Sequence, residues 1–229
     1  MKNKSFKYFS AGEIWLWLVS VSIIVVSFLL FDRKSYITMI TSLIGATALS
    51  FNAKGNPIGQ LLMVIFGVIY GLISYSFGYY GEMLTYMGMT VPMALIAFIS
   101  WIRNPYLGNR AETKVDSLKK GEIWFMIFLT SVVTILFYLI LKALNTPNLV
   151  PSTLSVATSF AAVYLTFRRN PYFALVYAAN DVVLIVLWIM AAMEDISYLS
   201  VIFCFFMFLI NDIYGFVSWK RMRVRQNRI

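Results

Sequence analysis

The sequence contains no histidine, and Cys204 is its only cysteine. These absences exclude histidine general bases, Cys–His nucleophiles, the usual zinc sites and a disulfide within the chain. We therefore expect a protein that is not an enzyme and that holds no cofactor or metal, with Cys204 as a packing residue.

Charged residues are also scarce, at 13% of the 229 positions, whereas 60% of the positions are hydrophobic. A water-soluble domain of this length could not bury so much apolar surface, so lipid is expected to be part of the solvent. The net charge of +9 could indicate nucleic acid, but Lys and Arg gather at the ends of apolar segments. That placement is typical of a protein embedded in a bilayer, with no nucleic-acid partner.

Eight apolar segments approach or reach the roughly 20 residues that a transmembrane helix needs. They cover residues 13–31, 36–52, 58–79, 83–102, 121–143, 150–167, 172–192 and 196–219. The polar stretch 103–120 is interpreted as a linker, and 220–229 as a basic tail. The sequence thus predicts an all-α polytopic membrane protein with eight spans, the first of them retained as a helix.

The basic residues indicate the orientation of these spans. Of the 19 Lys and Arg residues, all except Arg33, Lys34 and Lys142 fall on the side that holds both termini and the linker. Because basic loops stay in the cytoplasm, both termini and the linker are predicted to be cytoplasmic.

Three short motifs occur once in each half of the chain and in the same order. They are Gly-Glu-Ile-Trp at 12–15 and 121–124, Asn-Pro at 56–57 and 170–171, and Ser-Trp at 100–101 and 218–219. We interpret residues 13–102 and 121–219 as two repeats. Since each repeat has an even number of spans, the two are predicted to be parallel, as in transporters built from two halves.

The motifs also suggest roles for their own residues. Glu13 and Glu122 stand at predicted helix starts, where a carboxylate favours the helix dipole. Four tryptophans stand at the ends of spans and are expected to be anchors at the membrane interface: Trp15, Trp101, Trp124 and Trp219.

Polar residues deep in a span are costly and mark candidate binding sites. Asn180 and Asp181 lie at the middle of one span, and Asn211 and Asp212 lie within the last. Helical spacing adds Tyr177 and Trp188 near the first pair, Tyr214 near the second, and Gln60 and Tyr70 on the third span. Such a set suits a flat, hydrogen-bonding ligand, including a cationic one, although these residues could instead tie helices together.

The polar pairs are not duplicated. Phe66 and Gly67 occupy the first-half positions equivalent to Asn180 and Asp181, and Met93 with Ala94 stand opposite the second pair. We therefore expect a ligand to contact the second half more heavily.

At these residues the chain resembles the Pnu family of bacterial vitamin transporters. The resemblance covers nearly the whole chain and rests on Asn-Pro before the third span, the segment 179–183, and the run 211–215 with Trp219. It implies a SWEET-like fold in the bacterial cytoplasmic membrane, with two three-helix bundles joined by 121–143 and an extra N-terminal helix at 13–31. It also implies a homotrimer.

The resemblance further implies facilitated diffusion of a nucleoside-like vitamin, most often nicotinamide riboside, and trapping by a soluble cytoplasmic kinase. The pyridinium charge of that vitamin would fit Asp181 beside aromatic rings. Val176 departs from the Trp of many nicotinamide riboside members. Thiamine, riboflavin, a deoxyribonucleoside, or proton-coupled transport through Asp181 are therefore alternatives.

Overall fold

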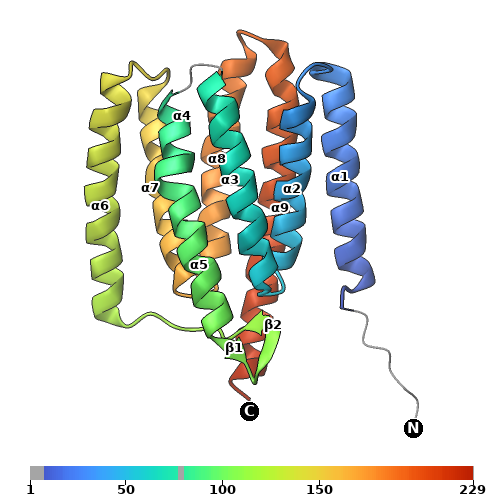
Figure 1. Cartoon of the computed structure of the whole chain (residues 1–229), viewed down its shortest axis with the longest axis vertical. Coiled ribbons are helices and arrows are strands. Elements are labelled where there is room, and N and C mark those ends of the chain that lie inside the picture. The colour runs from blue at the N-terminus through green and yellow to red at the C-terminus, as the bar shows by residue number, and fades with distance from the viewer. Residues whose placement is uncertain (1–7, 77–79, 229) are drawn as a thin grey trace.

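A computed structural model describes residues 8–76 and 80–228 as a bundle of long helices lying side by side (Figure 1). We call the end at which α1 begins and α9 finishes the terminal end. The opposite end, which carries the α1–α2, α6–α7 and α8–α9 connections, is the loop end. Two parts of the sequence predictions lie outside the described residues. They are the end of the predicted third span, residues 77–79, and the basic residues Lys2, Lys4 and Lys7.

The helices follow the predicted apolar segments within a few residues. They are α1 (Ala11–Phe31), α2 (Tyr36–Asn52), α3 (Pro57–Ser76), α4 (Tyr80–Thr85), α5 (Val91–Arg103), α6 (Lys120–Ala143), α7 (Leu149–Phe167), α8 (Tyr172–Ala192) and α9 (Leu199–Gln226). Among the described residues, seven helical segments are long and apolar enough to cross a membrane, and α2 is a shorter apolar helix of 17 residues. Cys204 is buried and unpaired, as expected for a packing residue.

The fourth predicted segment is a compound helix. A π-helical turn, η1 (Tyr86–Thr90), separates α4 from α5. Pro92, in the first turn of α5, has no N–H to donate to the carbonyl four residues earlier. The backbone N–H of Val91 just before it makes the wider i→i+5 bond, to the carbonyl of Tyr86.

The predicted linker contains a hairpin that the sequence did not indicate. β1 (Pro105–Tyr106) pairs antiparallel with β2 (Asn109–Thr113). Leu107 and Gly108 form the turn at positive φ of 47° and 78°. The last helix also continues past the predicted span, and its Gln226 side chain bonds the backbone of Thr113 and Val115.

Six helices form a closed ring, in the order α2, α3, α5, α7, α8 and α9. The remaining two long helices lie outside the ring on opposite flanks, α1 against α2 and α9, and α6 against α7 (Figure 1). The short three-residue helix η2 (Ile196–Tyr198) precedes α9 at the loop end.

Trp101 and Trp219 meet at the terminal end of the ring, with ring centroids 5.2 Å apart and no exposed surface. The indole Nε1 of Trp101 donates to the carbonyl of Thr166 at 2.9 Å, and that of Trp219 donates to the carbonyl of Asn52 at 2.7 Å. The prediction that both are interfacial anchors was wrong, because a span-end Trp can also turn inward to satisfy a helix carbonyl.

The neighbouring serines repeat this exchange. Ser100 donates to the carbonyl of Phe167 at 2.9 Å, and Ser218 donates to that of Ala53 at 2.7 Å. We call these four bonds the reciprocal Ser-Trp ties. In each half the Ser-Trp pair binds the C-terminal turn of a helix in the other half, so the ties join the halves at the terminal end.

The starts of α1 and α6 are held in matching ways. Glu13 accepts from the backbone N–H of Ser10, and Glu122 accepts from that of Lys119, as expected of helix caps. Each carboxylate also forms an ion pair with a basic residue in the loop that follows the next helix. Glu13 lies 2.8 Å from Lys54, and Glu122 lies 2.9 Å from Arg168.

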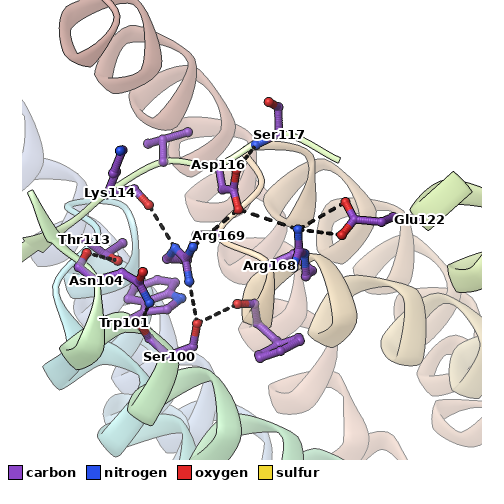
Figure 2. Close-up of polar contacts among 12 residues, drawn as sticks. Ser100, Trp101, Asn104, Thr113, Lys114, Asp116, Ser117, Glu122, Arg168 and Arg169 are labelled. Carbon is purple, nitrogen blue, oxygen red and sulfur yellow. Dashed lines mark hydrogen bonds and ion pairs between the residues drawn. The ribbon is translucent and has the colours of Figure 1, made fainter. Parts of the chain in front are cut away.

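Arg169 extends the network at the second of these loops (Figure 2). Its guanidinium donates to Ser100 Oγ at 2.7 Å and to the Lys114 carbonyl at 3.1 Å, and lies 3.4 Å from Asp116. Burial lowers the pKa of Arg169, whereas the charge of Asp116 raises it. The linker is thus fastened to the end of α7.

We predict that Trp101→Phe and Trp219→Phe each lower the unfolding free energy by about 1–2 kcal/mol. Each removes the indole hydrogen bond from a buried carbonyl, which is left with only the backbone N–H of Arg169 or Gly55, and each leaves a space among packed rings. Thermal unfolding in detergent micelles measures the change. Trp124→Phe is the matched control, since Trp124 is 72% exposed on the lipid-facing flank. Equal melting temperatures for all three variants would contradict a structural role for the ties.

Candidate functional site

A cavity of about 480 Å³ lies inside the ring of helices. Its lining includes the α6–α7 connection, Glu194 and Asp195 at the loop end, and it extends to Asn52 and Phe173 near the terminal end. Trp101 and Trp219 are absent from the lining and fully buried. The cavity is therefore reached from the loop end. It is closed at the terminal end by Trp101, Trp219 and the buried residues packed with them, which we call the tryptophan cluster.

The second half supplies a polar wall from α8 and α9. Tyr177, Asn180, Asp181 and Trp188 line the cavity from α8, and Asp212 lines it from α9. The sequence analysis named all five. The four residues of α8 share a face because positions three to four residues apart do so, and the packing of α9 against α8 brings Asp212 to the same wall.

Asn180 is positioned by α7. Its Oδ1 accepts hydrogen bonds from Thr158 at 2.8 Å and Ser159 at 3.1 Å. These bonds fix the amide plane and use its oxygen, which leaves the side-chain amino group of Asn180 as the donor of a residue that lines the cavity.

Two polar atoms of this wall have no hydrogen-bond partner among the described residues. They are Asp181 Oδ2 and Trp188 Nε1, on side chains that are only 4% and 7% exposed. The Asp181 and Asp212 carboxyls lie within hydrogen-bonding reach of each other, but two carboxylates bond only when they share a proton. Both residues line the cavity although these atoms are covered, so a rotation of either side chain would offer the atom to a polar ligand.

The first half contributes a more aromatic wall. Phe66, Tyr70 and Tyr86 line the cavity, together with Gln60 near the terminal end. Gln60 donates to Asn52 Oδ1 at 2.8 Å, so it links α3 to α2 as well as facing the cavity.

Asn211 and Tyr214 do not line the cavity. Asn211 donates to Ser20 on α1 at 2.9 Å, and the Tyr214 hydroxyl donates to Glu13 at 2.7 Å. Both residues bind α9 to α1, which is the helix-tying role that was the alternative. Val176 also lies away from the cavity and packs against the tryptophan cluster.

Three acidic residues of the lining were missed. Glu82 begins the compound fourth helix, and Glu194 and Asp195 lie in the α8–α9 connection, which reads as an ordinary polar loop. The backbone N–H of Ser197 donates to Asp195 and lowers the pKa of that carboxyl, so it stays ionised at the cavity mouth.

The charge of the lining is one-sided. Five carboxyl residues face the cavity, and the described lining contains no Lys or Arg. No group of three or more potential metal ligands occurs among the described residues. A carboxyl-rich, aromatic cavity favours an organic cation with hydrogen-bonding groups.

A ring of apolar helices, most of them long enough to cross a membrane, around a central cavity with acidic and aromatic lining is typical of a transporter of small molecules. Comparison with known proteins gives the family. A family model described as nicotinamide mononucleotide transporter matches residues 35–221, and the chain belongs to this family.

Two curated relatives are both named nicotinamide riboside transporter PnuC. The protein from Neisseria mucosa is 27% identical over 93% of this chain and 82% of its own length. That from Haemophilus influenzae is 23% identical over 84% of this chain and 83% of its own. A crystal structure titled as the vitamin B3 transporter PnuC matches with a TM-score of 0.82 at 23% identity, covering 96% of this chain and 95% of that one, and supports the fold.

We predict that substituting Asn180 affects ligand affinity, whereas substituting Asn211 affects stability. Asn180→Ala should weaken about tenfold the binding of the small molecule that the wild type takes up, because it removes a positioned donor from the cavity. Asn211→Ala should lower the unfolding free energy by about 1 kcal/mol and leave affinity unchanged, because it only unties α9 from α1.

Isothermal titration of purified protein measures the affinity, and thermal unfolding measures the stability. A loss of affinity in Asn211→Ala equal to that in Asn180→Ala would contradict the assignment of Asn180 to the site.

Proposed function

We propose that this protein carries nicotinamide riboside across the bacterial cytoplasmic membrane by facilitated diffusion, and that a soluble cytoplasmic kinase traps the vitamin by phosphorylation. The names of the curated relatives support the substrate. The observation that carries the proposal is the cavity lining, with five carboxyl residues and aromatic rings but no described Lys or Arg.

The same lining favours the riboside over its mononucleotide. The riboside carries one fixed positive charge on its pyridinium ring, which carboxylates and aromatic faces attract. The phosphate of the mononucleotide would have to enter past Glu194 and Asp195 without any basic partner in the described lining. Such an unpaired charge is costly to desolvate.

We further propose two parallel repeats in a SWEET-like arrangement with eight membrane spans. Support comes from the matching contacts of the halves. The Gly55 and Arg169 carbonyls, which occupy equivalent loops, accept from the linker N–H groups of Thr113 and Asp116 at 2.9 and 3.0 Å. The reciprocal Ser-Trp ties also occur once in each half at equivalent positions. The same holds for the ion pairs of Glu13 and Glu122.

For transport, we propose that the two bundles rock about the central site, with both termini in the cytoplasm. The basic side chains gathered at the terminal end support this orientation. The cavity would then face outward. The homotrimer and the kinase rest on the family resemblance alone.

Proteoliposomes test the function. With the membrane potential clamped at zero, we expect labelled nicotinamide riboside to enter until its concentrations inside and outside are equal, and the mononucleotide not to enter. Internal kinase with ATP should then raise the accumulated label. Uptake of thiamine, riboflavin or a deoxyribonucleoside in its place would change the substrate, and no uptake of any of them would reject the proposal.

A second candidate is proton-coupled transport, which the Asp181–Asp212 carboxyl pair favours. A proton shared between these two residues could exchange with the incoming cation. The uniporter proposal predicts that, at zero potential, a gradient of one pH unit leaves the wild-type uptake rate unchanged. A rate that follows the gradient in the wild type but not in Asp181→Asn would favour coupling.

A further inference from the structure

The first-half wall contains a carboxylate that neither the sequence analysis nor the family comparisons assign, beside an aromatic group of which the sequence analysis named only Tyr70 as a candidate site residue. Glu82 lies on α4, and Phe66, Tyr70 and Tyr86 form what we call the aromatic trio. The trio's ring centroids are 4.4 Å apart for Tyr70 and Tyr86, 5.7 Å for Phe66 and Tyr70, and 6.0 Å for Phe66 and Tyr86. All four residues line the cavity.

Local backbone features place Glu82 there. A Cβ at Gly81 would lie 2.6 Å from a methyl group of Leu141 and 2.7 Å from the hydroxyl of Thr146, so glycine lets α4 approach the end of α6 without moving either side chain. The π-helical turn then compensates the angular drift of a regular helix, so that Tyr86 and Thr90 line the same cavity as Glu82. Single π turns inside helices occur frequently at functional sites.

The surroundings of Glu82 supply hydroxyl groups but no positive charge. The Tyr70 and Ser74 hydroxyls lie near its carboxyl group. Tyr86 lies near enough to both Glu82 and Asp181 to interact with the charge of each. No described Lys or Arg lines the cavity, so an ionised Glu82 lacks a counter-charge until a cationic ligand supplies one.

The two walls therefore offer different chemistry. The second-half wall presents the Asn180 amide and the unpaired Asp181 Oδ2 and Trp188 Nε1, which suit hydroxyl and carboxamide groups. The first-half wall presents aromatic faces beside one carboxylate, the combination that attracts a delocalised organic cation.

We propose that Glu82 and the aromatic trio form the subsite for the cationic ring of the substrate, and that Glu82 determines selectivity for a charged over an uncharged ring. This inference rests on the proposed function and refines it, because it assigns the two ends of the substrate to opposite walls. The polar end of the substrate lies against Asn180 and Asp181.

Paired ligands test the assignment. Affinities of purified protein are measured for nicotinamide riboside and for its reduced 1,4-dihydro form, which has nearly the same shape but no charge on the ring. Glu82→Gln should weaken binding of the charged form about tenfold and leave that of the reduced form within about twofold. Glu82→Asp should retain part of the preference, because it restores the charge.

Asp32→Asn is the matched control. Asp32 is also at the loop end but lies outside the cavity lining, and an asparagine oxygen can still accept from the Ser35 backbone N–H. This variant removes the same charge from the chain and should keep the wild-type ratio of affinities. Tyr86→Leu should lower affinity for the charged form, whereas Tyr86→Phe should not, since only the first removes the ring.

An equal loss for both ligand forms in Glu82→Gln, or no loss for either, would overturn the subsite. Failure of the wild type to bind nicotinamide riboside would instead contradict the proposed function. In that case thiamine replaces nicotinamide riboside as the ligand, because its thiazolium ring also has a fixed charge. The affinities of Glu82→Gln and Asp32→Asn for thiamine are then compared. Binding of neither cation by the wild type would overturn both proposals.

Discussion

The reciprocal Ser-Trp ties are the interaction on which the arrangement of the two halves depends. A helix leaves its last carbonyls unsatisfied, and in an apolar bundle no bulk water is available to pair with them. Here Ser100 and Ser218 reach across to carbonyls at the ends of α7 and α2 that accept no other hydrogen bond from the described residues. The neighbouring indoles of Trp101 and Trp219 add a second donor to carbonyls that also accept a backbone N–H. The same contacts bring the two rings together at the centre, where they close the cavity. The side chains of the ties thus both bond the helix-end carbonyls and close the terminal end of the cavity.

The apolar runs were sufficient to predict the helices, because lipid imposes length and composition on every span. The break at η1 was not predicted, since its cause is a single proline near the start of α5 within an otherwise apolar helix. Span-end tryptophans were misread for a similar reason. Trp124 and Trp219 both stand at an end of a predicted span, yet Trp124 is 72% exposed and Trp219 is fully buried against residues of the first half.

The candidate site was likewise only partly predictable from the sequence. Asn180-Asp181 and Asn211-Asp212 are identical dipeptides in the middle of apolar helices, and both were expected near a ligand. Neighbouring residues on a helix point about 100° apart, so on α9 only the aspartate faces the cavity, whereas Asn211 faces α1. Glu82 was missed because it stands near a predicted helix end, where a carboxylate usually faces water. Its inward position depends on the close approach of Gly81 to α6.

The strength of the closure at the terminal end bears on how such a protein could work. Each hydrogen bond contributes about 0.5–1.5 kcal/mol net, so the four ties together are worth about 2–6 kcal/mol. That is the range over which a ligand's differential affinity shifts a two-state equilibrium. A substrate that bridges the aromatic trio and the Asn180 wall would draw the two halves together at the loop end. The free energy gained there has to match the cost of breaking the ties. A closure much stronger than this would hold the cavity permanently open to one side.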